Sequence, residues 1–396
     1  MRQQGRGRRK KAGVVVGLTA LLAAVTTSGC AIVGGSSPFF TPPPVRHVFV
    51  IMLENEGYSS TFGTPSADPY LATTLPSQGA LLTAYYGIGH ESNDNYVAFL
   101  SGQAPNGTNQ LDCTTFADFP SSSTVGSNGL LSGNGCVYPA SVPTLADQLD
   151  TAGLSWKGYM EDMGNVPSRE SATCAHPAVG AADNTQSAVA GDGYATRHDP
   201  FVYFHSIIDN TSLCGTHVVP LGTTASAMPA GTSAGVTGLA ADLASVATTP
   251  NLSFITPNLC DDGHDYPCTN QTGGASALAN IDTFLNTWVP LITSSPAFKA
   301  DGLLEITFDE ASTLDANGCC GQTPGPGQGN PGLIGPGGGL TGTILLSPFI
   351  APGTTTSTPY NHYSSLASIE TIFGLPRLGE ANNATTWFGA DVYTRP

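Results

Sequence analysis

The sequence predicts an α/β fold in which a mostly parallel central sheet carries helices on both faces. Short apolar runs alternate along the chain with segments of helical period, which is the pattern of parallel strands joined by helices. The first run, His47–Leu53 (HVFVIML), is apolar from its second residue onward, so we expect a strand buried on both faces. Polar residues directly follow several of these runs. Because ligands bind at the carboxyl ends of the strands in open parallel sheets, these polar residues are the first candidates for a site.

The other elements follow from the same two periods. Further strands are predicted at residues 154–160, 252–256, 302–308 and 342–347. Helices are predicted at residues 69–82, 95–100, 142–152, 275–291 and 364–373. Residues 318–339 are dense in Gly and Pro and contain no lysine, so they predict a mobile surface loop and not a nucleotide-binding loop.

Composition divides the chain into three segments. Residues 1–30 are typical of an export signal, with a basic start, a short apolar run and small residues ending in Cys30. A cysteine at this place resembles a lipoprotein cleavage box, so a membrane tether through Cys30 and release as a free protein both stay open. Residues 31–44 are rich in Gly, Ser and Pro and are expected to form a tether. Residues 45–396 are predicted to form a single domain in an extracytoplasmic protein.

The charge of the chain limits its partners. Six of the 13 Lys and Arg residues lie in the first 11 residues, which contain no acid, so the rest of the chain carries seven cations against 29 acids, a net charge of −22. A surface this acidic repels nucleic acid and anionic membranes. An enzyme for phosphates with so few cations would need another source of positive charge, which favours metal ions as a cofactor.

Eight cysteines remain when Cys30 is set aside, and an even number in an exported protein favours disulfides. The chain has no Cys-x-x-Cys pair of the kind that a zinc ribbon requires. The cysteine count alone leaves all pairings open. A bridge between Cys260 and Cys268 is our first choice because it would close the loop that holds His264.

Acidic residues follow three of the predicted strands. Glu54 and Asn55 follow the first strand, and Asp309 and Glu310 follow residues 302–308. Residues 258–265 (NLCDDGHD) follow the strand at 252–256. A single acid in such a place is most often a helix cap or a solvated loop residue. Three groups at one sheet edge would repel each other without a cation, and their oxygen and imidazole ligands suit a divalent ion.

Ser92 precedes a short predicted helix in residues 89–103 (GHESNDNYVAFLSGQ). A serine at this position is most often a helix cap. The functional alternative is a nucleophile at an anion-binding helix N-terminus, activated by a metal ion. A Ser-His-Asp hydrolase would instead require the Gly-x-Ser-x-Gly turn, and Ser92 lacks both glycines.

Seven motifs in order resemble the phosphoesterase family of bacterial acid phosphatases and phospholipases C, within the alkaline phosphatase superfamily. They span residues 45–375, and the sequence is most similar to the shorter secreted members of the acid phosphatase type. The motifs are Glu54-Asn55, Ser92 with Asn95-Tyr96 and Ser101-Gly102, YMEDM at 159–163, RHDPFVYF at 197–204, PNLCDDGHD at 257–265, TFDE at 307–310 and NHYS at 361–364.

The resemblance implies an alkaline-phosphatase-like fold and a role for each matching residue. The implied metal ligands are Glu54, Asn55, Ser92, Asp309, Glu310 and, less directly, Asp265. Ser92 would be the nucleophile, His198 and His264 would act in catalysis at the phosphate or the leaving group, and Asn95 and His362 would bind substrate. The chain departs from the family where Glu91 and Asp94 replace the two prolines that usually flank the nucleophile motif. Two extra carboxylates weaken anion binding unless they hold a second cation.

The expected function is therefore metal-dependent hydrolysis of a phosphomonoester, acting on a small phosphorylated substrate or a phospholipid head group. A phospholipase C that cleaves diesters is one alternative. A lipoprotein that only binds a phosphoryl ligand is another, which the Glu91 and Asp94 replacements would permit.

Overall fold

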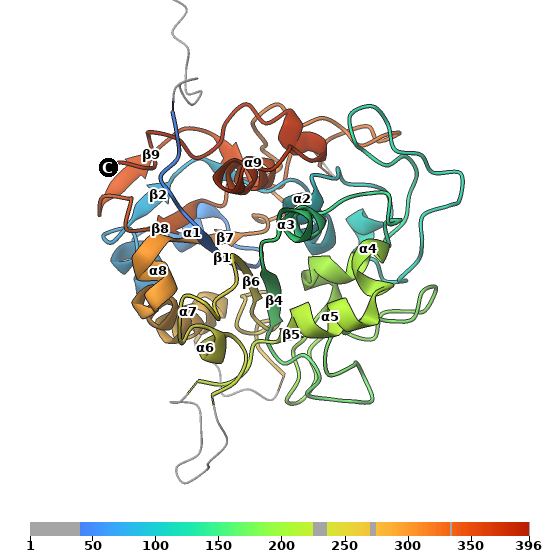
Figure 1. The fold of residues 1–396 in the computed structure, drawn as a ribbon, viewed down its shortest axis with the longest axis horizontal. Helices are drawn as coiled ribbons and strands as arrows, with labels where there is room; N and C mark the ends of the chain where they lie inside the picture. Colours follow the sequence, from blue (N-terminus) through green and yellow to red (C-terminus); the bar gives the residue numbers. More distant parts are fainter. Residues whose placement is uncertain (1–39, 225–235, 270–274, 333–334, 396) are drawn as a thin grey trace, which may run out of the picture. The chain divides into compact units, whose positions relative to one another are not determined.

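The computed structural model describes residues 40–224, 236–269, 275–332 and 335–395. The predicted export signal and residues 31–39 of the predicted tether lie outside the described residues. The described chain is built on an eight-stranded sheet with the order β5-β4-β6-β1-β7-β8-β2-β9 (Figure 1). A two-stranded sheet pairs β10 with β3.

Neighbouring strands of the large sheet are parallel except at β8, which runs antiparallel to both β7 and β2. The strands are β1 (His47–Leu53), β2 (Ala80–Leu82), β3 (Tyr85–Tyr86), β4 (Trp156–Met160), β5 (Val218–Pro220), β6 (Leu252–Thr256), β7 (Gly302–Phe308), β8 (Thr343–Leu346), β9 (Thr354–Thr356) and β10 (Tyr360–Asn361). The predicted mostly parallel sheet is therefore confirmed.

Strand β1 lies in the middle of the sheet and contributes to two hydrophobic cores. Val48, Val50 and Met52 pack into one core, while Phe49 and Ile51 pack into the other. Because successive side chains of a strand point to opposite faces, the apolar run HVFVIML can bury every residue only when both faces are covered.

Helices cover both faces, as predicted (Figure 1). Side chains of α2, α3, α4, α5 and α9 belong to the first core, and side chains of α6, α7 and α8 belong to the second. The helices are α1 (Tyr58–Thr61), α2 (Ser92–Ser101), α3 (Leu145–Ala152), α4 (His205–Ile208), α5 (Thr211–His217), α6 (Leu239–Asp242), α7 (Ala277–Ser294), α8 (Pro296–Asp301) and α9 (His362–Phe373). Across the described residues, every helix is too short or too polar to cross a bilayer.

The predicted helix at residues 69–82 is wrong in its second half. One turn of π-helix forms at Tyr70–Thr74, and Ala80–Leu82 then form β2 between β8 and β9. The chain leaves the helix before Gly79, whose backbone lies against the Leu345 carbonyl of β8 with no room for a side chain. The apolar residues at 80 and 82 are therefore buried by a sheet edge, and not by a helix face.

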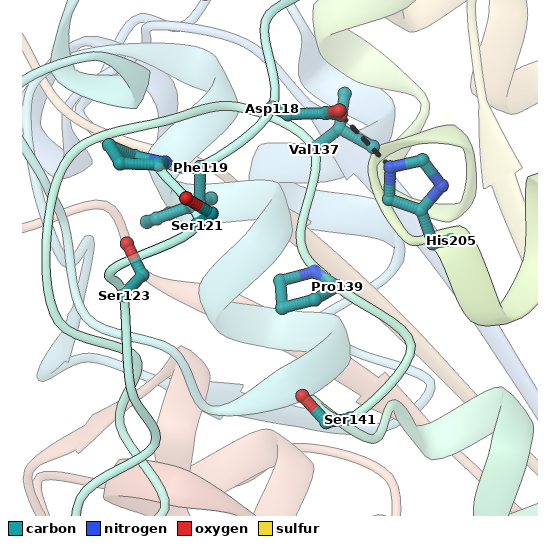
Figure 2. Close-up of a pocket in the computed structure, with 9 residues that line it drawn as sticks. Asp118, Phe119, Ser121, Ser123, Val137, Pro139, Ser141 and His205 are labelled. Carbon is teal, nitrogen blue, oxygen red and sulfur yellow. Dashed lines mark hydrogen bonds and ion pairs between the residues drawn. The ribbon is translucent and has the colours of Figure 1, made fainter.

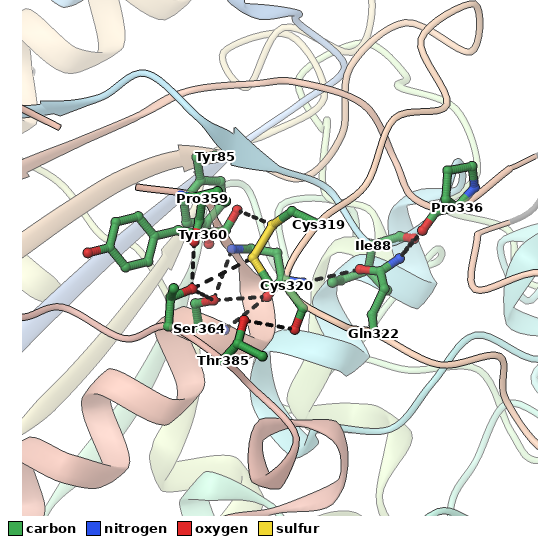
Figure 3. The surroundings of a disulfide bond; sticks show 12 residues. Tyr85, Ile88, Cys319, Cys320, Gln322, Pro336, Pro359, Tyr360, Ser364 and Thr385 are labelled. Carbon is green, nitrogen blue, oxygen red and sulfur yellow. Dashed lines mark hydrogen bonds between the residues drawn. A yellow bond between two sulfur atoms is a disulfide. The ribbon is translucent and has the colours of Figure 1, made fainter. Parts of the chain in front are cut away.

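The eight cysteines that follow Cys30 all form disulfides, as predicted. The predicted Cys260–Cys268 bridge is confirmed. The other bridges are Cys113–Cys136, Cys174–Cys214 and Cys319–Cys320. The last joins adjacent residues at the start of the Gly- and Pro-rich segment 318–339, whose described residues contain no helix or strand (Figure 3). Gln322 connects this segment to the loop before α2, since its Nε2 donates to the Ile88 carbonyl (3.2 Å).

Candidate active site

The carboxyl ends of β1 and β7 place two predicted metal ligands at one edge of the sheet. Leu53 and Phe308 are register partners, so Glu54 and Asp309 follow side by side. Asn55 adopts the left-handed conformation (φ 53), which asparagine tolerates better than most residues. This conformation allows the Asn55 N–H to donate to Asp309 Oδ1 (3.1 Å). Both carboxylates are completely buried.

Ser92 is the first residue of α2, and Glu91 holds the cap position. The Ser92 hydroxyl donates to Glu54 Oε2 (2.8 Å) and lies 3.1 Å from His198 Nε2. The serine is therefore not a helix cap in this structure. Its oxygen faces the acidic sheet edge at the positive end of the helix.

A histidine and an aspartate are aligned behind the serine. His198 ends the 3-10 turn Thr196–His198, and its Nδ1 lies 3.0 Å from Asp262 Oδ2. Burial, together with Arg197 and His264, lowers the pKa of His198 well below its usual value, which favours the neutral imidazole. A neutral imidazole oriented by a carboxylate can take a proton from a serine hydroxyl. The sequence predicted activation of Ser92 by a metal ion, and this base beside the serine is an addition that the structure reveals.

The residues present fit a divalent cation. Ligand atoms of Glu54, His198 and Asp262 lie within 4.8 Å of one another. Three buried oxygens of residues that follow β1 and β7 have no hydrogen-bond partner, namely Glu54 Oε1, Asn55 Oδ1 and Asp309 Oδ2. Burial and the neighbouring Asp309 and Asp262 raise the pKa of Glu54 well above its usual range, and burial raises the pKa of Asp309 to about 6. Buried carboxylates of this kind are stable when a cation pairs with them.

Two predicted substrate-binding residues are engaged by the protein itself. His362 Nε2 donates to the Asp309 carbonyl (2.6 Å), and its Nδ1 lies 3.0 Å from the Tyr85 hydroxyl, so neither ring nitrogen is free for a substrate. Asn95 Oδ1 accepts from the Ile88 N–H (2.7 Å), and its Nδ2 donates to the Glu91 carbonyl (3.1 Å). In this structure His362 supports Asp309, and Asn95 holds the loop that leads to Ser92.

His264 and Asp265 lie closer to solvent than the serine. The His264 side chain is 26% exposed, and its Nδ1 lies 2.8 Å from Asp265 Oδ1. Arg197 Nη2 lies 3.1 Å from His264 Nε2, and Arg197 Nε lies 3.5 Å from Asp112 Oδ2. Asp265, predicted as a metal ligand, is therefore placed as the partner of His264. Arg197 is a buried cation beside His264.

Two residues of the site were not assigned from the sequence, namely Asp262 and Arg197. Asp262 and Arg197 stand in motifs that were singled out, but nothing in the sequence shows that they contact His198 and His264.

A separate pocket of about 230 Å³ lies beside His205 (Figure 2). One ring nitrogen of His205 lies 2.9 Å from Asp118 Oδ1, and the other lies 2.9 Å from Asp209 Oδ1. The pocket contains none of the predicted site residues, so we do not assign it to the reaction.

Comparison with known proteins identifies relatives among phosphatases. The chain is 28% identical over 331 residues to an acid phosphatase of Aspergillus fumigatus, covering 84% of this chain and 55% of that protein. It is 29% identical over 329 residues to the phosphate-repressible acid phosphatase of Penicillium chrysogenum, covering 83% and 59%. A phosphatidylinositol-3-phosphatase of Mycobacterium tuberculosis is 26% identical over 344 residues, covering 86% and 81%. The chain thus spans less than two thirds of the length of the two fungal relatives.

A solved structure of a protein in the alkaline phosphatase superfamily from Vibrio parahaemolyticus is 12% identical, with a TM-score of 0.47, covering 86% of this chain and 69% of that one. The sequence model of the Phosphoesterase family matches residues 67–376, a range that includes Ser92, His198 and Asp309. This match extends over most of the chain, which therefore belongs to the Phosphoesterase family.

Proposed function

We propose that the chain is an extracytoplasmic, metal-dependent phosphomonoesterase in which Ser92 is the nucleophile. The observation that carries this proposal is the position of the Ser92 hydroxyl, between Glu54 and His198 at the N-terminus of α2. The similarity to acid phosphatases supports phosphoester hydrolysis. Disulfides support an oxidising compartment outside the cytoplasm.

Glu54, Asn55, Ser92 and Asp309 would hold the metal ion, with His198 and Asp262 beside them. A divalent cation bound there would lower the pKa of the serine hydroxyl and neutralise charge on a phosphoryl oxygen. Glu54, Asp262 and Asp309 are fully buried carboxylates at the position where a ligand would bind. A phosphate dianion would be repelled by this edge of the sheet without a counter-charge.

Side chains of the site then carry out the separate steps of the reaction. Ser92 Oγ attacks phosphorus as His198 Nε2 accepts its proton, and Asp262 holds the imidazole in the required orientation. The bond from phosphorus to the leaving oxygen breaks, and that oxygen takes a proton from solvent beside the more exposed His264, whose Nε2 accepts from Arg197. Water then attacks the phosphoserine and phosphate is released, while His198 returns its proton to Ser92 Oγ.

A binding protein without catalysis is the second candidate, because Glu91 and Asp94 add negative charge beside the nucleophile. Burial and the nearby Asp112 raise the pKa of Glu91 to about 7.

Turnover of para-nitrophenyl phosphate, compared with turnover of its phosphorylcholine ester, separates the candidate functions. We expect cleavage of the monoester only, and loss of that activity with chelator. Preferred cleavage of the diester would indicate a phospholipase C, and binding without turnover would indicate the second candidate.

The metal requirement has a matched test at the two ends of β7. Asp309 follows the strand in the site, and Asp301 precedes it at the opposite end, paired with His47. We expect Asp309→Asn to lower both metal content and rate, and Asp301→Asn to leave both close to the parent. Elemental analysis and initial rates on the same samples provide the measurement. Full activity in a metal-free preparation would contradict the proposal.

A further inference from the structure

A second group of buried side chains able to bind metal lies around the loop before α2. His90, Asp94 and Glu310 are 2%, 0% and 5% exposed. None of them belongs to the Glu54, His198 and Asp262 group. Glu310 was expected among the ligands of the first ion. In the structure its Oε2 instead lies 3.6 Å from His90 Nδ1 and 3.4 Å from Asn95 Nδ2.

His90 has the hydrogen-bonding arrangement of a metal ligand. Its Nε2 lies 3.0 Å from the Asp315 carbonyl oxygen, which can only accept, so the ring proton is on Nε2. The lone pair is then on Nδ1, which has no hydrogen-bond partner. Metal-binding histidines typically donate their other ring N–H to a carbonyl or carboxylate in this way. His90 Nδ1 and Glu310 Oε2 are thus 3.6 Å apart with no hydrogen bond between them. A cation could bind to both atoms.

Asp94 is a fully buried carboxylate with neither oxygen hydrogen-bonded. It packs against Gly89, where a Cβ atom would overlap both carboxylate oxygens, so the close approach requires glycine. Its neighbours are also acids, since Asp112, Glu91 and Asp309 all act on it electrostatically. A carboxylate buried among acids destabilises the fold unless a counter-ion or a proton offsets its charge.

From these contacts we propose that His90, Asp94 and Glu310 form a second divalent cation site beside the Ser92 centre. One imidazole and two carboxylates suit a borderline ion such as Zn²⁺ or Mn²⁺. Asp309, whose Oδ2 is unpaired, acts electrostatically on Glu54 of the first group and on Glu310 of the second. Among the described residues only the Glu54 group has three ligand atoms within 4.8 Å, so the second site would close on its ion by rotation of side chains.

The second site would explain why Asp94 stands where the family usually has a proline beside the nucleophile motif. An added cation beside the nucleophile would restore the attraction for a phosphoryl group that the added acids remove. The inference does not rest on the proposed phosphatase activity, because the ion can be counted without a substrate.

Metal content of the full chain tests the proposal. After dialysis against Zn²⁺ we expect two ions per chain in the parent, and one ion in His90→Asn and in Asp94→Asn. Glu54→Gln should also keep one ion, and the double variant His90→Asn/Glu54→Gln should keep none. His176→Asn is the control, because this histidine belongs to neither group and contacts the Pro177 carbonyl and Phe116. A parent that binds a single ion, or a His90 variant that keeps two, overturns the proposal.

Thermal unfolding provides a second readout that does not depend on counting. Asp94→Asn removes an unpaired buried charge and should fold at least as well as the parent in the absence of metal. As the Zn²⁺ concentration increases, we expect the unfolding temperature of the parent to rise in two steps, one for each ion bound. The unfolding temperature of the variant should rise in one step. Equal responses to Zn²⁺ would show that Asp94 is merely a protonated buried acid. Two bound ions in a chain without turnover would uphold the second site while refuting the proposed function.

Discussion

Ser92 and Ser101 are the serines at the two ends of α2, and their hydroxyl groups differ in what they contact. Ser101 Oγ donates to the Val97 carbonyl within the helix (2.7 Å). Ser92 Oγ leaves the helix and donates to Glu54, beside His198. The Ser101 hydroxyl therefore forms a hydrogen bond within the helix, and the Ser92 hydroxyl contacts residues of the site.

We predict that Ser92→Ala lowers turnover at least about 100-fold, because an activated nucleophile is lost, while the metal content stays close to the parent's. Ser101→Ala should retain most of the activity. Trapping with a slow substrate in acid, followed by peptide mapping, should place a phosphoryl group on the Ser92 peptide. An alanine variant that keeps more than about one hundredth of the parent rate would assign the attack to another group.

The residues that could be predicted from the sequence are those that directly follow a strand. Glu54 and Asp309 could be placed together because adjacent parallel strands end at one edge of the sheet. Asp262 reaches His198 across 64 positions of the chain, and His90 reaches Glu310 across a still longer interval. Such contacts depend on how loops return to the sheet, which no local pattern in the sequence records.

At the scale of elements, length decides what could be predicted. The boundaries of β1, β6 and β7 agree with the predicted ranges, since each is a run of five to seven buried residues. The strands β2, β5 and β9 were not predicted, and each has only three residues. Three residues are too few for a periodic pattern. Their pairing is set by the neighbouring strands that they complete.

The disulfides differ in the length of chain that they close. Cys174–Cys214 spans 40 residues, whereas Cys319–Cys320 joins neighbours in the chain. In the chain-entropy model a bridge stabilises more when its loop is longer. The first bridge should therefore matter more for global stability than the second.

We predict that the double variant Cys174→Ser/Cys214→Ser loses about 2–4 kcal/mol of unfolding free energy, and that Cys319→Ser/Cys320→Ser loses less. Reducing agent should lower stability far more than the rate of the enzyme that remains folded, because no cysteine lies in the site. Urea unfolding and initial rates, measured on the same samples, check both expectations. Four or more free thiols in the native protein would contradict this assignment of the cysteines.

At the scale of the whole molecule, acids determine how stability depends on pH. Without its first 11 residues the chain carries a net charge of −22, so the folded form repels itself at neutral pH. Burial also raises the pKa of Asp68, Asp199 and Glu370, each to about 8. For His205, burial alone would lower the pKa, but hydrogen bonds to Asp209 and Asp118 raise it overall.

All these shifts have the same sign. A group whose pKa is higher in the folded than in the unfolded state stabilises the fold fully below the unfolded pKa. That contribution is lost as the pH rises through the folded pKa. For the three buried acids the loss extends from about pH 4 to about pH 8, and each can contribute at most about 1.4 kcal/mol per pH unit. Self-repulsion between surface carboxylates grows over the same range.

We therefore predict that the metal-free protein is more stable at about pH 5 than at about pH 8, as measured by urea unfolding. Two comparisons separate the causes. Salt at about 0.5 M should reduce the part that comes from surface repulsion, because screening acts mainly on exposed charges. Asp199→Asn should reduce the part that remains in high salt, because it removes a buried acid. The asparagine oxygen can still accept from the Phe201 N–H, and its NH2 group can donate to the Tyr194 hydroxyl oxygen, which itself donates to the Ala175 carbonyl. If stability instead rises between these two pH values in both salt conditions, the buried acids must be ionised in the folded state and paired with cations.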